Sequence, residues 1–548
     1  MTEIPANHLL ILVAAMVISM TLIPVMVRLA PVLGMVDKPD PRKVHSVPIP
    51  RVGGVGIVIG SLVPLLVWLP IDTLTASYLA GALILLLFGA WDDAKELGHY
   101  VKFIGQFAAV LGVVYWGDLY VTQLPLLGPE AMSESMGRVF TVIAMVGMIN
   151  AMNHSDGLDG LAGGESLISL LAIIYLAYQA GGDMAVVVAV ATIGGVFGFL
   201  RFNSHPARVF MGDGGSQFLG FTLAFLAVYL MTRVNPALSP ALPLLFLGLP
   251  IVDILAVFAQ RIYHGMNWFK ASKNHIHHRL LELGFEHHES VITIYAIQAL
   301  LVLLAVVLPY EHDLLIIGIY VGVSVAVFAG LIVAERSGWR KSRERLLFPA
   351  VKAFGVIRKQ PQFLQALTGL VMAVIALYAL VVAFVVEQVP LQFGYILVVL
   401  AGLLLARLLA GFRLWFLFLR LTLFLSMAAL VYLVNLYPQP WFTEVSRFFD
   451  YAVFAVLILA IAAGMRFAEN SRFDVSPLDF LVILMLLVAG IFPQQIGLSE
   501  MLLRLIIEFV VLFYAVEWVL KHMRSRWNLM TLGVLGSLVV LSGRFVLG

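Results

Sequence analysis

The sequence predicts an all-α protein that crosses a membrane many times. Hydrophobic residues make up 61% of the 548-residue chain, charged residues make up 12%, and the mean hydropathy is +0.99. A soluble fold of this composition would have too few polar residues to cover its surface. The chain has no cysteine, which excludes disulfides, thiolate metal sites and cysteine nucleophiles. Its formal net charge of +2 gives no reason to expect a nucleic-acid partner.

Apolar runs of membrane-crossing length predict about eleven transmembrane helices in the first half and about seven in the second. The first run is too long for the core of a signal peptide, so we expect it to remain as a helix. The runs of the first half are 8–30, 52–70, 74–91, 101–117, 139–152, 167–181, 184–200, 215–232, 242–263, 290–309 and 313–334. Those of the second half are 363–386, 391–410, 414–436, 449–465, 478–492, 501–520 and 530–547.

The distribution of basic residues predicts the orientation. Placing successive loops on alternate sides leaves all but five of the 34 Lys and Arg on one side. The positive-inside rule makes that side cytoplasmic, so both termini are predicted on the opposite, periplasmic side. The sustained bias also supports the number of spans, because one wrong span would reverse every later loop.

A basic segment, residues 335–360, divides the predicted spans into two domains. It carries eight Lys and Arg and is predicted to be a cytoplasmic linker. One interpretation is an ordinary positive-inside anchor, and the other is a segment that lies on anionic lipid. We expect one membrane domain over residues 1–334 and a second, of unknown role, over residues 361–548.

Five polar clusters lie in the predicted cytoplasmic loops of the first domain. The first is a proline-rich basic loop with Lys38, Arg42, His45 and Arg51. Prolines make such a loop stiff, and its cationic side chains would bind an anion. The alternative is a basic loop that only orients the protein in the membrane.

The second cluster is the acidic pair Asp92-Asp93 at the cytoplasmic end of the third span. Adjacent carboxylates near a membrane resist desolvation unless a cation compensates them, so the pair favours a divalent metal or a bound proton. A solvated helix end is the alternative. Lys102, just inside the fourth span, either faces the same site or reaches toward the membrane surface.

The third cluster is the segment 150–164, which combines two amides, two carboxylates and four glycines. Asn150, Asn153, Asp156 and Asp159 recur every three residues, which would place them on one face if the segment were helical. The glycines would let the backbone approach a ligand closely. An EF-hand is excluded, because the glutamate that ends its calcium loop is missing.

The last two clusters are a glycine-rich loop around Asp213 and a histidine loop. Asp213 suits a hard cation, and the backbone donors around it suit a phosphate that would share the cation. His275, His277, His278 and Arg279 fall within five positions. Their spacing is not that of a helical zinc site, and we interpret them as a clamp on a diphosphate, with zinc or a loop without a binding role as the alternatives. Together the clusters predict magnesium-dependent phosphoryl chemistry at the cytoplasmic surface.

These motifs resemble those of the polyprenyl-phosphate N-acetylhexosamine-1-phosphate transferases and follow one another in the same order as in that family. The resemblance extends over about residues 8–334. One departure is the pair His154-Ser155, where that family more often has apolar residues. The motifs that carry the resemblance are Lys38-Pro…Arg42-Lys-Val-His45…Pro-Ile-Pro-Arg51-Val-Gly-Gly, Asp92-Asp93, Asn153…Asp156-Gly-Leu-Asp159-Gly, Met211-Gly-Asp213-Gly-Gly-Ser and His275-Ile-His-His278.

The resemblance implies a bacterial inner-membrane enzyme that moves a sugar 1-phosphate from a UDP-N-acetylhexosamine onto polyprenyl phosphate and releases UMP. This is the first membrane step of cell-envelope polysaccharide synthesis, such as that of the lipopolysaccharide O-antigen. The His-Ile-His-His form is similar to the branch that uses UDP-N-acetylglucosamine. Direct attack by the lipid phosphate is the mechanism we expect, and a covalent aspartyl intermediate is the alternative.

By the same resemblance, roles are implied for residues of this chain. Asp213 would bind Mg²⁺, with Mn²⁺ as the alternative ion, and Asp92 or Asp93 would prepare the lipid phosphate as a base or second metal contact. Lys102 would help to cancel the repulsion between the two phosphates. Asn153, Asp156 and Asp159, with Asn150 nearby, would line the nucleotide and metal pocket. The diphosphate would be held by His275, His277, His278 and Arg279.

The second domain has no counterpart in this family. Its most notable feature is Glu500, Arg504 and Glu508 at intervals of four, with Glu517 further along the same predicted span. These charges either neutralise one another on one helix face or contact a lipid diphosphate or a partner, such as a second copy of the chain or an envelope-assembly protein. The rival function for the whole chain is a transporter whose carboxylates relay protons; UMP release distinguishes the two.

Overall fold

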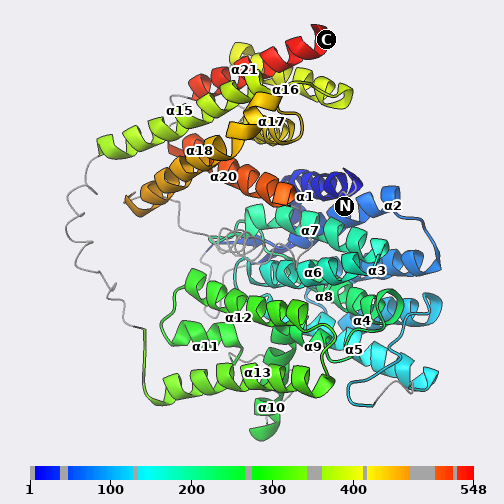
Figure 1. Ribbon diagram of the computed structural model, residues 1–548. Coiled ribbons are helices and arrows are strands. Elements are labelled where there is room, and N and C mark those ends of the chain that lie inside the picture. Colours follow the sequence, from blue (N-terminus) through cyan, green and yellow to red (C-terminus); the bar gives the residue numbers. More distant parts are fainter. Residues whose placement is uncertain are drawn as a thin grey trace. The chain divides into compact units, whose positions relative to one another are not determined.

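The computed structural model describes residues 6–37, 47–127, 132–265, 274–341, 361–410, 416–467, 500–522 and 527–547 (Figure 1). These residues are helical almost throughout, apart from a short antiparallel pairing of β1 (Val36–Asp37) with β2 (Ile49–Pro50). Ten of the described helices are long and apolar enough to cross a membrane, and shorter apolar helices accompany them. The prediction of an all-α, polytopic membrane protein is confirmed. The count of eleven plus seven spans is not, and the predicted span 478–492 lies outside the described residues.

The described chain divides into two compact units, which we treat separately. The described part of the first unit ends at residue 341, and that of the second begins at residue 361. Residues 342–360 of the predicted linker lie outside the described residues. The assignment of separate roles to 1–334 and 361–548 therefore stays a prediction.

Apart from α11, the helices of the first unit coincide with the predicted apolar runs. The run 242–263 is divided between two helices, because the chain departs from helical geometry at Leu247. The bounds are α1 (Ala6–Leu33), α2 (Gly53–Trp68), α3 (Thr73–Lys95), α4 (His99–Leu111), the π-helical turn η1 (Gly112–Trp116), α5 (Glu134–Ser155), α6 (Leu161–Gln179), α7 (Asp183–Asn203), α8 (Gly212–Tyr229), the π-helical turn η2 (Leu230–Val234), α9 (Pro243–Phe246), α10 (Gly248–Tyr263), α11 (Ile276–Glu282), α12 (His287–Val307) and α13 (Asp313–Arg336).

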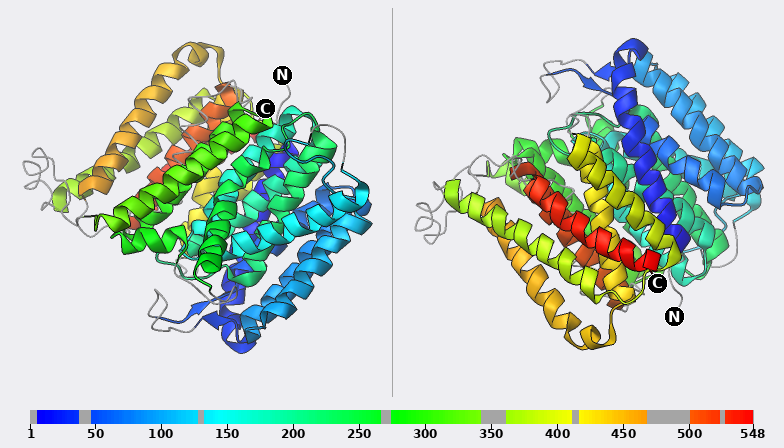
Figure 2. Two further views of the ribbon diagram at one scale, coloured as in Figure 1. Left: turned by 90° about the horizontal axis from the view of Figure 1, so that it is seen from below. Right: turned by 90° about the horizontal axis from the view of Figure 1, so that it is seen from above.

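Helix α8 is the centre of this unit, and both views in Figure 2 show the surrounding helices running alongside one another. Every residue of α8 from Gly214 to Val228 is buried, against neighbours that include α2, α3 and α5. Two glycines bring the neighbours close to its beginning. A Cβ at Gly89 of α3 would lie 2.2 Å from the Gly214 Cα, and one at Gly54 of α2 would lie 2.3 Å from the Gly215 nitrogen. The glycines thus hold the end of α3, with its acidic pair, against the start of α8.

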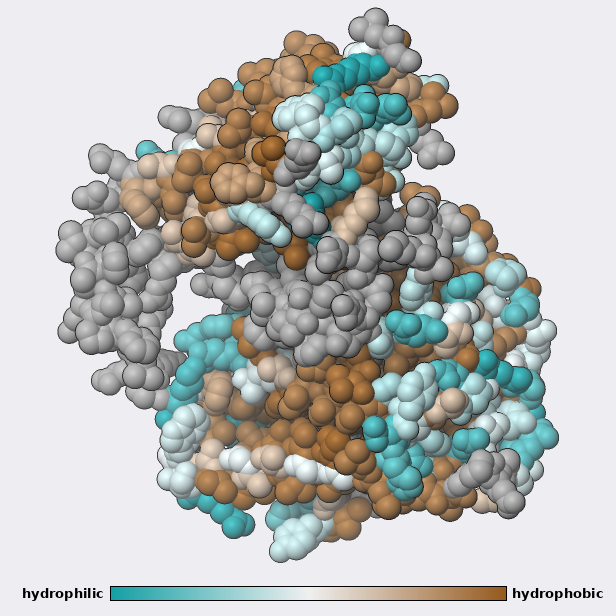
Figure 3. Space-filling model, in the orientation of Figure 1, coloured by the Kyte–Doolittle hydropathy of each residue, from teal (hydrophilic) through white to brown (hydrophobic). Residues whose placement is uncertain are grey.

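The outer face of the first unit has the hydropathy expected beside lipid. In Figure 3, brown side chains cover the region of α12 and α13, and teal side chains gather toward the two ends of the helices. Along α13, Leu314, Val321, Val325 and Val333 are each at least half exposed. Exposed apolar side chains at this density are unfavourable in water and favourable in a bilayer.

The second unit is also a helical bundle. Its buried core is apolar, with residues such as Ile375, Leu430, Leu457 and Trp518. Helix α20 carries more charged residues than a typical span, but Glu508 and Glu517 on it are buried inside the unit. The bounds are α15 (Pro361–Val385), α16 (Leu391–Ala410), α17 (Phe416–Leu436), α18 (Pro440–Phe467), α20 (Glu500–His522) and α21 (Trp527–Leu547).

Candidate active site

An acidic centre forms where α3 ends, α4 begins and α8 begins. The Lys102 Nζ lies 2.7 Å from the Asp92 Oδ2 and 2.7 Å from the Asp213 Oδ2. The other oxygen of Asp92, Oδ1, accepts the backbone N–H of Leu97 at 2.6 Å. Asp92 is buried, and the side chains of Lys102 and Asp213 are 26% and 22% exposed. One cation thus bridges two carboxylates that would otherwise repel each other at the edge of the membrane domain.

The two members of the acidic pair have different surroundings. The Asp93 carboxylate accepts the backbone N–H groups of Asp213 and Gly214, at 3.0 and 3.4 Å. These two N–H groups belong to the first turn of α8 and have no acceptor within the helix itself. A negative charge at this end of a helix is stabilised by the helix dipole. Gly212 has φ +72°, and a Cβ there would lie 2.4 Å from the Asp93 carboxylate. Asp93 therefore fixes the start of α8, whereas Asp92 faces Lys102.

A chain of amide side chains lies behind the acidic centre. Asn150 donates to the Gln106 Oε1 at 2.8 Å, and Gln106 donates to Gln217 at 3.4 Å. Gln217 in turn donates to the Asp213 Oδ2 at 3.4 Å. Asn153, one turn after Asn150 on α5, lies beside the same carboxylate and donates to the Ser216 Oγ at 2.9 Å. The predicted residues Asn150 and Asn153 thus belong to the surroundings of Asp213.

Asp156 directly follows the last residue of α5 and faces the same centre. Burial, together with the negative charges of Asp213 and Asp159, raises the pKa of Asp156 to about 7. Because α5 ends at Ser155, the segment 150–159 is not one continuous helix, and the single helical face considered from the sequence is not formed.

This donor set fits Mg²⁺. Hard divalent cations prefer carboxylate oxygens, and Asp92 and Asp213 together carry more negative charge than Lys102 alone neutralises. Asp156 supplies further carboxyl oxygens beside them. A lysine ammonium already occupies the position between two of these carboxylates, which shows that the arrangement accommodates positive charge.

Asp159 lies in a separate group with two histidines. Its Oδ2 is 2.7 Å from the His205 Nδ1 and accepts the N–H of Ala207 at 3.0 Å, while its own N–H donates to the His287 Nε2 at 3.0 Å. Burial would raise the pKa of Asp159, but the hydrogen bonds from His205 and Ala207 outweigh it and lower that pKa. The two imidazole rings stack at 4.0 Å.

The metal-binding atoms of this Asp159 group lie within 4.8 Å of one another, a spacing that could hold a metal ion. The His287 Nε2 already accepts a backbone N–H, whereas its Nδ1 is buried and has no hydrogen-bond partner among the described residues. The histidines for which the sequence left zinc as an alternative, His275, His277 and His278, are different ones.

The first histidine of the predicted clamp is held by a carboxylate on α10. The Asp253 Oδ2 lies 2.7 Å from the His275 Nδ1, and its Oδ1 accepts the N–H of Ile276 at 2.9 Å. Both side chains are buried. An ionised carboxylate only accepts hydrogen bonds, so Nδ1 carries the hydrogen and Nε2 is the nitrogen left for a ligand. The ring of His154 stacks on His275 at 5.5 Å.

His277 and His278 complete the histidine cluster, and they lie in the first turn of the short helix α11 rather than in the loop predicted from the sequence. Their rings are 4.2 Å apart. Burial, with smaller contributions from the neighbouring histidines, lowers the pKa of His277 well below its usual value, so this imidazole is neutral. Its Nε2 has no hydrogen-bond partner among the described residues. A Cβ at Gly157 would lie 2.2 Å from this nitrogen, so only glycine permits the contact between the two loops.

Two of the three arginines predicted to bind anions lie among the described residues, and both are paired with carboxylates. Arg279 donates from Nε and Nη2 to both oxygens of Glu335 at the end of α13, at 2.7 and 2.8 Å. The Arg279 Nη1 is buried and has no partner in the described part of the chain. Arg51 pairs with Asp37 beside the short β pairing. The remaining residues predicted for the basic loop, Lys38, Arg42 and His45, lie outside the described residues.

Several residues of this region were not predicted from the sequence. Asp253, Gln106 and Gln217 lie inside predicted apolar runs, and a polar residue in such a run is itself a signal of a functional site. His205 and His287 carry no comparable signal, because histidines in loops are common.

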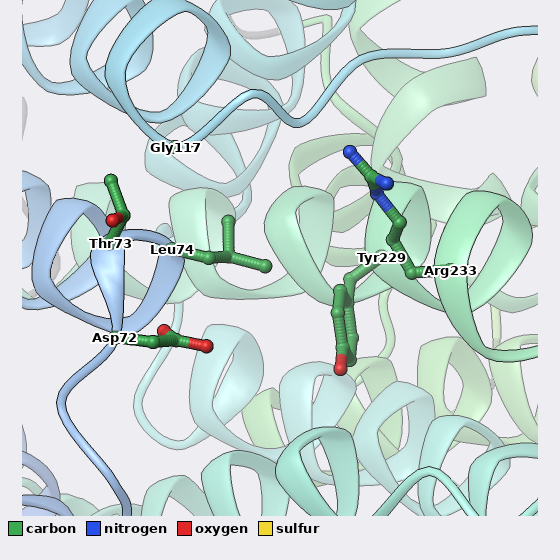
Figure 4. Close-up of a pocket in the computed structure, with 6 residues that line it drawn as sticks. All are labelled: Asp72, Thr73, Leu74, Gly117, Tyr229 and Arg233. Carbon is green, nitrogen blue, oxygen red and sulfur yellow. The ribbon is translucent and has the colours of Figure 1, made fainter.

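A separate open pocket of about 380 Å³ lies at the other end of α3 (Figure 4). In Figure 4, the side chains of Tyr229, the last residue of α8, and Arg233 of η2 lie opposite the start of α3. None of the predicted site residues that the structure describes lines this pocket. It is lined by Asp72, Thr73, Leu74, Gly117, Tyr229 and Arg233.

Comparisons with known proteins agree with the family resemblance that the sequence motifs indicated. Residues 75–231 match the family model described as glycosyl transferase family 4. The chain is 34% identical over 303 residues to the probable undecaprenyl-phosphate N-acetylglucosaminyl 1-phosphate transferase of Bacillus subtilis, which covers 54% of this chain and 85% of that protein. It is 29% identical over 294 residues to the undecaprenyl-phosphate alpha-N-acetylglucosaminyl 1-phosphate transferase of Escherichia coli K12, covering 52% and 79%. Identity to the decaprenyl-phosphate N-acetylglucosaminephosphotransferase of Mycobacterium tuberculosis is 33% over 299 residues, covering 49% and 74%.

Proposed function

The chain belongs to glycosyl transferase family 4, and we propose that it transfers N-acetylglucosamine 1-phosphate from UDP-N-acetylglucosamine to a polyprenyl phosphate. Undecaprenyl phosphate is the expected acceptor, because relatives from two bacteria are named for it. The observation that carries the proposal for this chain is the convergence of Asp92, Lys102 and Asp213 at the ends of three helices, with Asp156 beside them.

The reaction is a direct displacement at phosphorus. An oxygen of the lipid phosphate forms a bond to the β-phosphorus of the sugar nucleotide, and the bond from that phosphorus to the oxygen bridging to UMP breaks. UMP leaves with the electron pair, and the lipid carries a diphosphate linked to the sugar. The lipid phosphate is already anionic at neutral pH, so the site has to align two anions and reduce their repulsion.

Asp213 and Asp92 are the residues we expect to hold Mg²⁺. When bound, the ion supplies positive charge that neutralises the phosphate oxygens in the transition state. Lys102 adds a second positive charge between the same carboxylates. Asp93 keeps the start of α8 in place through its two backbone hydrogen bonds, and we assign it a positioning role.

The histidine loop is the proposed contact for the diphosphate of the donor. His275 presents its Nε2 while Asp253 holds the opposite nitrogen. His277 and His278 lie next to it, and Gly157 brings the loop after α5 against His277. The Asp159 group sits further along that loop, where we expect the nucleoside part of the donor.

The proposed setting is a bacterial cytoplasmic membrane. The excess of Lys and Arg in the loops that carry the site residues supports a cytoplasmic active site with periplasmic termini. The product would be the lipid-linked sugar on which an envelope polysaccharide is built. We propose that residues 1–334 carry this activity and that residues 361–548 form a separate membrane domain.

The proposal is tested by UMP release from purified full-length protein supplied with polyprenyl phosphate, Mg²⁺ and a panel of UDP-sugars. We expect release with UDP-N-acetylglucosamine and its loss in Asp213→Asn and with a chelator. Asp118→Asn is the matched control, since Asp118 is exposed and pairs with Arg138 and Arg233 near the other end of the unit. Folded protein that releases no UMP from any UDP-sugar would contradict the proposal and favour the transporter interpretation.

A further inference from the structure

The second unit contains buried ionisable groups that the transferase reaction does not use. Tyr378 of α15, Asn435 of α17, Asp450 of α18, and Arg504 and Glu508 of α20 form what we call the interior cluster. Their four helices pack on one another within this unit, as Figure 1 shows. Tyr378, Glu508 and Asp450 are 0%, 2% and 8% exposed.

The charges of α20 are directed toward other helices. Asn435 donates from Nδ2 to the Glu508 Oε2 at 2.7 Å. The Arg504 Nη1 lies 3.9 Å from the Asp450 Oδ2, which is at the limit of an ion pair. Glu508 and Arg504 therefore interact with residues of α17 and α18. Charges that only neutralised one another on one face of α20 would not need these partners.

Three oxygens of the interior cluster are left without partners. The Tyr378 Oη, the Asp450 Oδ1 and the Glu508 Oε1 are buried and make no hydrogen bond within the described residues. The Tyr378 ring packs on Phe449 and Phe454 of α18, which are next to Asp450 and one turn after it, with ring centroids 6.3 and 5.6 Å away. Tyr378 is also close enough to Glu508 to interact with it electrostatically, so the three side chains face a common region. Unpaired polar atoms are unfavourable inside a membrane domain, and three of them from three helices indicate a ligand with several oxygen contacts.

The charge of the interior cluster selects the kind of ligand. When both carboxyl groups are ionised, the two carboxylates and one guanidinium leave one negative charge. A lipid diphosphate, one of the ligands considered from the sequence, would be repelled. A divalent ion would leave an excess positive charge, and a proton on one carboxyl group would leave the other oxygens unsatisfied. A single monovalent metal ion neutralises the cluster and accepts several oxygen ligands.

We propose that the interior cluster is a binding site for one alkali cation, with Tyr378, Asp450 and Glu508 as its oxygen ligands. Sodium is the probe for testing it. The site belongs to the second unit and does not depend on the transferase function proposed above.

The test is equilibrium binding of ²²Na⁺ to purified full-length protein, with choline as the replacement cation. We expect saturable binding of one sodium ion per chain. Glu508→Gln keeps an acceptor for Asn435, and Asp450→Asn keeps the size of the side chain, so both variants should fold while their affinity falls at least tenfold. Tyr378→Phe keeps the ring contact with Phe454 and removes only the oxygen, and we expect it to weaken binding severalfold.

Two controls locate the bound ion. Glu387→Gln removes an exposed carboxylate of the same unit and should leave binding unchanged. Asp213→Asn alters the acidic centre of the first unit and should also leave it unchanged. Absence of saturable binding between pH 6 and 9 would overturn the proposal, as would native affinity in Glu508→Gln and Asp450→Asn. Loss of binding in Asp213→Asn alone would place the ion in the first unit and overturn it as well. Thermal unfolding of each variant confirms that it is folded.

Discussion

Replacing Asp253 by Asn tests whether the histidine loop works through an oriented imidazole. In the native protein the carboxylate accepts both the His275 Nδ1–H and the Ile276 N–H. Asparagine has one acceptor oxygen, which can keep the bond to Ile276, and its amide nitrogen then faces His275. An amide donor requires an acceptor at Nδ1, so the hydrogen of the imidazole moves to Nε2. The side-chain volume hardly changes.

The expected loss follows from the hydrogen bond removed. A hydrogen bond to a charged group contributes about 1.5–3 kcal/mol, which corresponds to about 10- to 150-fold in a rate constant. We therefore expect Asp253→Asn to lower kcat/KM for UDP-N-acetylglucosamine by that factor in the UMP-release assay. The melting temperature should change little, because the bond to Ile276 is kept.

The matched control is His275→Ala, alone and combined with Asp253→Asn. If Asp253 acts through His275, the double variant is no slower than His275→Ala, because the oriented imidazole is already absent. Effects that multiply in the double variant would refute the reasoning. So would a native kcat/KM in Asp253→Asn beside a large loss in His275→Ala.

Three further predictions concern the acidic centre and its neighbours. Lys102→Met leaves two facing carboxylates with one cation fewer, and UMP release at saturating Mg²⁺ should fall by about 10²-fold, as for loss of one transition-state donor; a native rate would contradict it. The raised pKa of Asp156 favours its protonated form in the folded protein, so its contribution to stability is present at low pH and lost as pH rises through about 7. In Mg²⁺-free buffer the melting temperature should thus decline from about pH 5 to about pH 7 and level off above that, and Asp156→Asn should flatten this decline; an unchanged slope would show that other groups cause it. Gly157→Ala places a Cβ against the His277 Nε2 and should raise the dissociation constant for UDP-N-acetylglucosamine at least tenfold by calorimetry, whereas native affinity would show that the two loops separate freely.

The sequence predicted the parts of the fold that depend on local pattern. Apolar runs of membrane length identified the helices of the first unit, because burial in lipid or in a helical bundle requires continuous apolar segments. It could not predict which member of the acidic pair faces Lys102. Neighbouring residues on a helix point about 100° apart, and only the packing of α3 against α8 decides that Asp92 faces Lys102 while Asp93 caps α8.

Contacts between distant segments account for the rest of the differences. Arg279 was expected to hold a diphosphate, and in the structure Glu335, 56 residues later, holds its guanidinium. Asp253 and His275 lie 22 residues apart on different helices, and no spacing in the sequence signals their pairing. Asp159 was grouped with Asp156, but the end of α5 at Ser155 lets the chain turn and directs Asp159 toward two histidines.

The central claim, transfer of a sugar phosphate by the acidic centre, is tested most directly by following the β-phosphate of the donor. Full-length protein is incubated with UDP-N-acetylglucosamine labelled with ³²P at that phosphate, polyprenyl phosphate and Mg²⁺, and lipid and aqueous fractions are counted. We predict that the label enters the lipid fraction, that an equal amount of unlabelled UMP appears in the aqueous fraction, and that Asp213→Asn produces neither. Label that leaves with the nucleotide as UDP, or transfer that continues in Asp213→Asn, would contradict the account.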